Sequence, residues 1–168
     1  LAQGIPSFHT AMHIAQSAKK AIDANLVGKY TQSNGIEPLR FAIAKKVHRE
    51  NGIRVLPSEV LVTHGATEAF MAIFMGILDP EDEIIVPTPG YASHLTQIQI
   101  ARNGKKALEV PLSETNRDWV LDPNRLTKAV TKRTKAIVIT NPTNPTGKAY
   151  SKKELKEIAR IAQKHNLY

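Results

Sequence analysis

The first candidate functional site is a glycine between a predicted strand and a predicted helix. Residues 60–63 are a short β-branched run, Gly65 follows, and residues 66–78 are apolar nearly all round. A helix that starts there presents free backbone N–H groups and the positive end of its dipole, and the Thr67 hydroxyl adds a donor. Phosphate is the natural ligand of such a turn. The alternative is that Gly65 serves only as a strand-to-helix turn.

Two further candidates follow predicted strands, where the ligands of open α/β sheets gather. Residues 141–147 (NPTNPTG) come directly after an apolar run, and their two prolines and glycine hold a turn rigidly enough to aim an amide side chain. Residues 87–91 (PTPGY) would put the Tyr91 ring over a flat ligand. The alternatives are a purely structural turn in the first case and simple packing of the tyrosine in the second.

The elements that must position these residues alternate between helix and strand. Short runs rich in Ile and Val predict strands near 60–63, 83–87, 106–112 and 135–140. Apolar residues at helical spacing predict helices over 10–25, 37–51, 66–78, 92–103, 123–131 and from 152 onward. Strands that alternate with helices imply crossovers, so we expect an α/β fold with a mostly parallel sheet and crossover helices, preceded by a helical arm.

Local signals mark several element ends. Thr10 is expected to cap the first helix, Asp122 stands before a proline at the start of another, and Ser151 with Glu154 makes a capping box ahead of the last. Residues 167–168 then resemble the start of a further strand, which predicts that the chain is a fragment. We assign residues 1–52 to an amino-terminal arm and part of a small domain, and residues 53–168 to a larger domain.

Composition excludes several classes of protein. The 168 residues include no cysteine, which removes disulfide-stapled and Cys-liganded classes, and 42% are hydrophobic, as in ordinary globular proteins. No apolar stretch reaches the ~18 residues of a membrane span, and no secretory signal opens the chain, so we expect no membrane contact and a cytoplasmic location.

The basic charge and the histidines give no separate function. The net charge of +8 is spread along the chain as pairs such as Lys105-Lys106, and aromatic residues make up only 5%, so we expect no nucleic-acid partner. The histidines lack the spacing of metal ligands, and we expect no metal site. Trp119 and the three methionines are expected in the core.

Six motifs, in this order and with these spacings, resemble the fold-type I, class I and II aminotransferases that use pyridoxal 5′-phosphate (PLP). The match extends over nearly the whole chain. The motifs are Gly4-Ile5-Pro6-Ser7-Phe8, Lys29-Tyr30 with Gly35 and Leu39-Arg40, Gly65-Ala66-Thr67-Glu68-Ala69, Asp79-Pro80-Glu81-Asp82-Glu83, Pro89-Gly90-Tyr91 and Asn144-Pro145-Thr146-Gly147. The resemblance implies that residues 53–168 are the first half of a PLP-binding large domain, truncated at Tyr168.

The resemblance also implies roles for residues of the three candidate sites. Gly65, Ala66 and Thr67 would hold the cofactor phosphate through backbone N–H groups and the Thr67 hydroxyl. Tyr91 would stack on the pyridine ring. Asn144 would donate to the phenolic oxygen of that ring and help to place the substrate carboxylate.

Two residues of the amino-terminal part complete the implied site. Gly4 would offer its backbone to the substrate carboxylate, and Tyr30 would reach the phosphate held by a partner subunit. The resemblance therefore implies a homodimer that acts on an amino acid and a 2-keto acid.

The family's Schiff-base lysine belongs to a part of the sequence beyond Tyr168. Lys148 and Lys152-Lys153 lie in the wrong context to replace it, so we expect this chain alone to contain no catalytic residue and to be inactive. Two alternatives stay open: the parent is a PLP-dependent carbon–sulfur lyase or cyclopropane-forming synthase of the same fold, or the chain is a non-catalytic truncated module. The substrate amino acid is not predicted.

Overall fold

The computed structural model describes residues 4–115 and 118–168. Contacts divide the chain into two compact units, Leu1–Val62 and Thr63–Tyr168, each of which is described by itself. The predicted boundary between residues 52 and 53 stays a prediction. Among the described residues, none of the helices combines the length and the apolar character needed to cross a lipid bilayer.

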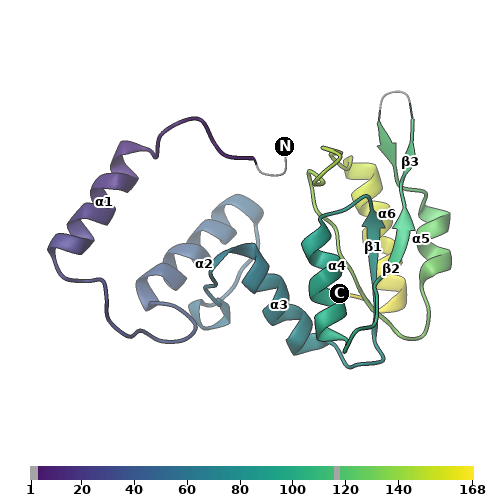
Figure 1. Ribbon diagram of the computed structural model, residues 1–168, viewed down its shortest axis with the longest axis horizontal. Coiled ribbons are helices and arrows are strands. Elements are labelled where there is room, and N and C mark those ends of the chain that lie inside the picture. Colours follow the sequence, from purple (N-terminus) through teal and green to yellow (C-terminus); the bar gives the residue numbers. More distant parts are fainter. Residues whose placement is uncertain (1–3, 116–117) are drawn as a thin grey trace. The chain divides into compact units, whose positions relative to one another are not determined.

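The first unit is helical, as expected. It contains α1 (Met12–Asp23), α2 (Glu37–Asn51) and the short 3₁₀ helix η1 (Pro57–Glu59) (Figure 1). The prediction that Thr10 caps α1 is wrong. The first hydrogen bonds of the helix go to the carbonyl of Ala11, which is the N-cap residue, so Thr10 lies one residue too early.

A buried arginine ties the first unit together. Arg40 of α2 is 8% exposed and donates from Nε to the Gly35 carbonyl at 3.1 Å and from a terminal nitrogen to the Pro57 carbonyl at 2.9 Å. Its other terminal nitrogen donates to the Gln32 side chain at 2.9 Å. These bonds connect α2 to the loops on either side of it.

The second unit is a parallel α/β structure. Its sheet has the order β2 (Leu108–Pro111), β1 (Glu83–Thr88), β5 (Thr134–Ile137), and both pairings are parallel. The helices are α3 (Gly65–Ile77), α4 (Ala92–Ala101), α5 (Pro123–Ala129) and α6 (Lys152–His165). A two-stranded antiparallel ribbon, β3 (Ser113–Glu114) with β4 (Trp119–Val120), was not expected from the sequence.

The predicted strand at residues 60–63 is wrong. These residues are extended but belong to no sheet, and Val62 donates its N–H to the Asn34 carbonyl at 3.1 Å. Both edges of β1 are taken by β2 and β5. The outer edge of β5 is taken by Tyr168, whose N–H donates to the Lys135 carbonyl at 3.0 Å and whose carbonyl accepts from Ile137 at 2.9 Å. Tyr168 thus makes strand-like hydrogen bonds beside β5, although residues 167–168 are not assigned to a strand.

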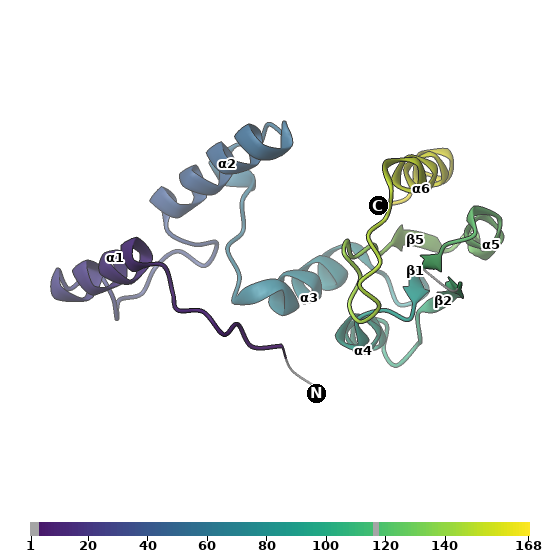
Figure 2. The same cartoon turned by 90° about the horizontal axis from the view of Figure 1, so that it is seen from above.

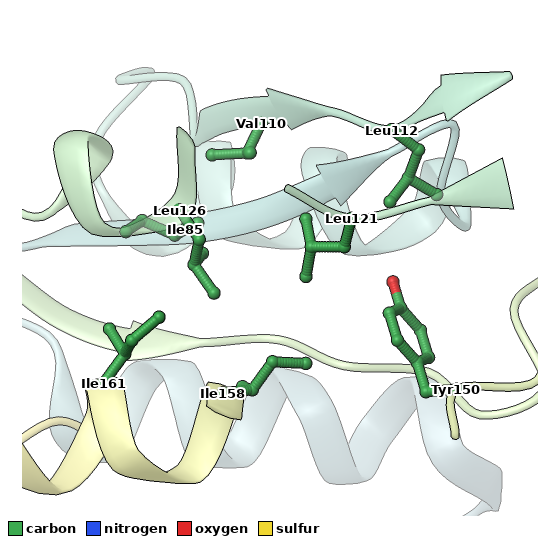
Figure 3. Packing of buried hydrophobic residues seen from close by; sticks show 8 residues of the cluster. All are labelled: Ile85, Val110, Leu112, Leu121, Leu126, Tyr150, Ile158 and Ile161. Carbon is green, nitrogen blue, oxygen red and sulfur yellow. The ribbon is translucent and has the colours of Figure 1, made fainter. Parts of the chain in front are cut away.

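Two apolar clusters cover the two faces of the sheet, because successive residues of β1 point to opposite sides. Ile84 and Val86 face α3 and α4, whereas Ile85 faces α5 and α6. Figure 2 shows α4 and α6 on opposite sides of the strands. In Figure 3 the side chains of the second cluster point toward one another between the strands and α6. Its members are Ile85, Val110, Leu112, Leu121, Leu126, Tyr150, Ile158 and Ile161.

The expectation of a helix buried all round at residues 66–78 is wrong. Of the α3 residues only Phe74 is fully buried, while Ile73 is 51% and Met75 62% exposed. Within the described residues one side of the helix packs on the sheet and α4, and no described segment of its own unit covers the other. Met12 of α1 is 70% exposed, so two of the three methionines lie outside the core. Trp119 packs at the edge of the second cluster.

Two of the three predicted side-chain caps form, at the starts of α5 and α6. Asp122 accepts from the N–H of Asn124 at 2.8 Å at the start of α5. At the start of α6, the Ser151 hydroxyl accepts from Glu154 N–H at 3.2 Å and the Glu154 carboxylate accepts from Ser151 N–H at 2.8 Å. This reciprocal pair is the predicted capping box.

An ion pair between the buried Glu83 and the exposed Arg133 closes the sheet at the amino end of β1. The Glu83 carboxylate accepts from the Thr131 hydroxyl and from Arg133, whose Nε lies 3.0 Å away. Burial alone would raise the pKa of Glu83, but these hydrogen bonds outweigh it, so its pKa lies below the usual value. The carboxylate is therefore charged at neutral pH.

Candidate functional site

The three candidate segments meet in one cleft of the second unit. The cleft has a volume of about 460 Å³ and lies where the start of α3, the segment after β1 and the turn after β5 come together. Its lining residues are Ala66, Thr67, Phe70, Tyr91, His94, Gln97, Ile139, Thr140, Asn141 and Asn144. The parallel strands β1 and β5 end at the same edge of the sheet, which brings the segment after β1 and the turn after β5 together. The start of α3 is held beside them by Gln97 of α4, which donates to the Thr67 carbonyl.

The start of α3 leaves backbone donors free. Gly65 has φ +80°, a conformation that favours glycine, and it turns the chain into the helix. No acceptor among the described residues bonds the N–H groups of Ala66 and Thr67, as is usual in the first turn of a helix. The Glu68 carboxylate accepts from the backbone N–H of His64, and this bond lowers the pKa of Glu68. The two donors next to it stay available for an anion.

A buried glutamine supports this turn from α4. Gln97 is 6% exposed, and its amide nitrogen donates to the carbonyl of Thr67. Its amide oxygen is buried without a hydrogen-bond partner among the described residues. The bond joins residues 30 positions apart and fixes the donors of α3 relative to α4.

An aromatic wall forms the next side of the cleft. Tyr91 is 39% exposed and meets the His94 ring edge-on, with centroids 5.3 Å apart. His94 in turn contacts Phe70 at 4.1 Å between centroids, and its burial lowers the pKa of His94. Gly90 precedes the wall because a Cβ there would lie 2.8 Å from the Pro87 carbonyl oxygen. The wall is neutral near pH 7 and leaves part of the tyrosine ring open.

The turn after β5 carries the amide. Asn144 is exposed and lines the cleft, while Thr143 next to it is buried. The Thr143 hydroxyl donates to the Thr140 carbonyl at 2.8 Å, and the Thr143 N–H donates to the Lys148 carbonyl at 2.8 Å. The Asn141 side chain accepts from Tyr150 N–H at 2.8 Å. The turn is thus held by its neighbours, and Asn144 is left to face the cleft.

The structure brings some of the predicted site residues together. Ala66, Thr67, Tyr91 and Asn144 line the cleft, and Gly65 immediately precedes it. Gly4 and Tyr30 belong to the first unit, where both are exposed, and their roles stay predictions.

Sequence reasoning missed several lining residues of the cleft. Phe70, His94 and Gln97 were not predicted. Phe70 follows the predicted Thr67 by three residues on α3, and His94 and Gln97 follow the predicted Tyr91 at the same spacing along α4. A polar and aromatic stripe at this spacing is a signal that the sequence offered. The buried environment of His94 and Gln97 was not readable from it, because it depends on how the two helices pack.

Fold and site together define a class of protein. It is a parallel α/β protein whose cleft presents helix-terminal N–H donors, an open aromatic face and an amide, which suits a flat, phosphorylated ligand. The family model described as "Aminotransferase class I and II" matches residues 1–168, and the chain belongs to that family. The predicted resemblance and the predicted fold class are both confirmed.

Individual relatives are similar over almost the whole chain. An aspartate/prephenate aminotransferase of Thermus thermophilus is 40% identical over 168 residues, which is all of this chain and 43% of that protein. An aspartate aminotransferase of Bacillus subtilis is 38% identical over 167 residues, 99% of this chain and 42% of that protein. The chain thus spans less than half the length of these curated relatives.

Solved structures of aminotransferases are also similar to this chain over almost its whole length. The N-succinyldiaminopimelate aminotransferase of Mycobacterium tuberculosis superposes with a TM-score of 0.89 at 40% identity, covering 98% of this chain and 42% of that one. A mutant Thermus thermophilus aspartate aminotransferase gives a TM-score of 0.91 at 40% identity, covering 99% of this chain and 45% of that one.

Proposed function

We propose that the second unit holds PLP in its cleft and that the whole protein is a PLP-dependent aminotransferase, which moves an amino group between an amino acid and a 2-keto acid. Membership of the aminotransferase family supports the reaction class. The observation that carries the cofactor is the convergence of helix-terminal donors, an aromatic ring and an amide on one cleft of about 460 Å³.

The residues present fit this cofactor. The N–H groups of Ala66 and Thr67 and the Thr67 hydroxyl would hold its phosphate, because a helix start is an anion site. Tyr91 would stack on the pyridine ring with the part of its ring that stays open. Asn144 would donate to the phenolic oxygen of the cofactor. No acidic side chain lines the cleft among the described residues, and the nearby Glu68 carboxylate is bonded to the N–H of His64.

These residues bind and orient; they do not carry out the proton transfer. When bound, PLP supplies the electron sink that makes the α-proton of an amino acid removable. Tyr91 and the neutral His94 present an apolar wall that excludes water from one side of the ring. Gln97 keeps the phosphate donors at a fixed place relative to that wall, so the ring and the phosphate are oriented together.

The whole protein would complete the site with groups from elsewhere. We propose that it is a homodimer in the cytoplasm, that Tyr30 reaches the phosphate of a partner subunit, and that Gly4 and Asn144 contact the substrate carboxylate. The relatives named above act on different substrates by their names, and we propose no particular amino acid.

Three probes test the cofactor site in the chain of 168 residues. Pyridoxamine 5′-phosphate, inorganic phosphate and pyridoxamine share parts of the cofactor and form no covalent link with surface lysines. We expect the backbone amide signals of Ala66 and Thr67 to move with both phosphates, with a dissociation constant on the order of millimolar. Pyridoxamine alone should leave them in place and move the signals of Tyr91 instead.

A pair of threonine variants supplies the control. Thr67→Val removes one donor without changing shape and should weaken both phosphate probes about two- to tenfold, the value of one hydrogen bond. Thr96→Val changes an exposed threonine of α4 outside the cleft and should leave the affinities unchanged. If the chain is folded and the amides of Ala66 and Thr67 stay in place at phosphate concentrations on the order of tens of millimolar, this turn does not bind phosphate.

A further inference from the structure

A lysine is buried beneath the turn that carries Asn144. The side chain of Lys148 is only 1% exposed, although lysine is almost never buried without a partner. Its Nζ lies 2.8 Å from Glu154 Oε1 and 3.8 Å from Asp118 Oδ2. It also lies 5.0 Å from the centroid of the Tyr150 ring. Four segments meet at this cation: the turn, the ribbon of β3 and β4, the Tyr150 segment and the start of α6.

The Glu154 carboxylate makes two interactions, one with each oxygen. Oε1 of Glu154 contacts Lys148, while Oε2 accepts from Ser151 N–H in the capping box of α6. Burial would raise the pKa of Glu154, but the bonds from Lys148 and Ser151 outweigh it and the pKa lies below its usual value. The carboxylate is therefore ionised at neutral pH, and the buried ammonium keeps its counter-charge.

The backbone of Lys148 closes the same turn. Its carbonyl accepts from Thr143 N–H at 2.8 Å, and its N–H donates to the Thr146 hydroxyl at 3.3 Å. Gly147 N–H donates to the Thr143 carbonyl at 2.7 Å. Among the described contacts the Asn144 side chain makes no hydrogen bond, so the backbone of the turn alone sets its direction. A displacement of Lys148 would therefore move the backbone of the turn and, with it, the side chain of Asn144.

We propose that Lys148 is a positioning residue: its ion pair with Glu154 fastens the turn of residues 141–147 to the start of α6 and thereby aims the Asn144 amide into the cleft. Lys148 itself touches no ligand, because its ammonium is enclosed and paired. The proposal rests on the proposed function only in what Asn144 contacts; the aiming of the amide is a property of the free chain.

Two single variants and their combination test this proposal. Lys148→Met keeps the length of the side chain and removes its charge. Glu154→Gln keeps the capping box, in which glutamine also serves, but leaves the ammonium unpaired. The double variant removes both charges, so it leaves no unpaired charge buried and is expected to fold. Lys152→Met, at an exposed lysine of α6, is the matched control.

The first readout needs no ligand. We expect the side-chain amide signals of Asn144 to shift and broaden in Lys148→Met and in the double variant, and to stay in place in Lys152→Met. Signals of Asn144 that coincide with the wild type in the double variant would overturn the proposal. This readout stands even if the chain binds no cofactor, so its result is separate from that of the proposed function.

The second readout separates positioning from general loosening. Pyridoxamine 5′-phosphate would contact both the phosphate donors and Asn144, whereas inorganic phosphate would contact only the donors. We expect the double variant to weaken the first probe about two- to tenfold, the value of one hydrogen bond, and to leave the second unchanged. An equal loss for both probes would show that the variant disturbs the whole unit and would overturn the proposal.

Discussion

Replacing Gly65 by alanine tests the geometry on which the proposed phosphate site depends. The residue has φ +80°, and a Cβ built there meets no atom within 4 Å. A steric clash therefore contributes nothing, and the cost is that of holding an L-residue in the left-handed region, about 1–2 kcal/mol. The smaller conformational entropy of the unfolded alanine chain offsets part of this cost, by about 0.4–1 kcal/mol. We expect Gly65→Ala to destabilise the second unit by about 1 kcal/mol.

Gly76 supplies a control of opposite sign in the same helix. It also has nothing within 4 Å of a built Cβ, but its φ is not positive. Gly76→Ala should therefore stabilise by about 0.5–1 kcal/mol through helix propensity alone. Gly65→Asn should fall between wild type and Gly65→Ala, because asparagine tolerates positive φ better.

Urea unfolding followed by tryptophan fluorescence measures these differences. Trp119 is the only tryptophan and lies in β4 of the second unit, so its signal reports the unit that contains α3. With a slope of about 2 kcal/mol/M, a loss of about 1 kcal/mol moves the midpoint down by about 0.5 M. If Gly65→Ala is as stable as the wild type, or shifts the midpoint in the same direction as Gly76→Ala, the left-handed turn at Gly65 is refuted.

Three further predictions concern the stability of the second unit. Because the pKa of Glu83 is lowered in the folded protein, its pair with Arg133 stabilises the fold above about pH 4.5, and this contribution is lost as the pH falls. In an acid titration, Glu83→Gln should therefore be less stable than the wild type at pH 7 and should lose less of its stability below about pH 4.5. Ser151→Ala should cost about 1 kcal/mol in urea unfolding through loss of the cap, and an unchanged midpoint would contradict the capping box. Leu126→Ala, at a fully buried site, should cost about 2–5 kcal/mol, whereas Met75→Ala on the exposed side of α3 should stay within about 0.5 kcal/mol; similar losses would contradict the assigned burial.

The elements that the sequence predicted correctly are those with a local cause. Ser151 and Glu154 are three residues apart, and their side chains satisfy each other's backbone donors without help from the rest of the chain. The segment at 60–63 had the same β-branched signal as β1, yet it forms no strand. Strand pairing needs a partner strand, and residues 60–62 belong to the first unit, whereas the sheet belongs to the second. Composition favours an extended backbone but does not supply the partner.

The residues of the site likewise divide into those that the sequence predicted and those that it did not. Thr67, Tyr91 and Asn144 stand in turns whose glycines and prolines are visible in the sequence, so the cleft residues at those turns were predicted. His94 and Gln97 were not, because each is polar by composition and becomes buried only when α4 packs against α3. No single segment contains the information that places them.

The exposed residues that line the cleft and the buried residues that support them therefore have different roles, for a physical reason. Tyr91 and Asn144, which are proposed to contact the ligand, are both exposed, so neither is held rigidly by its own packing. The supporting residues Gln97 and Lys148 are polar, yet 6% and 3% exposed, and a buried polar group destabilises the fold unless its bonds are made. Gln97 donates to the Thr67 carbonyl, and Lys148 pairs with the Glu154 carboxylate. Each bond holds a segment that lines the cleft. Because breaking either bond would leave a buried polar group unpaired, the fold itself favours the arrangement in which the start of α3 and the turn of residues 141–147 are held at the cleft.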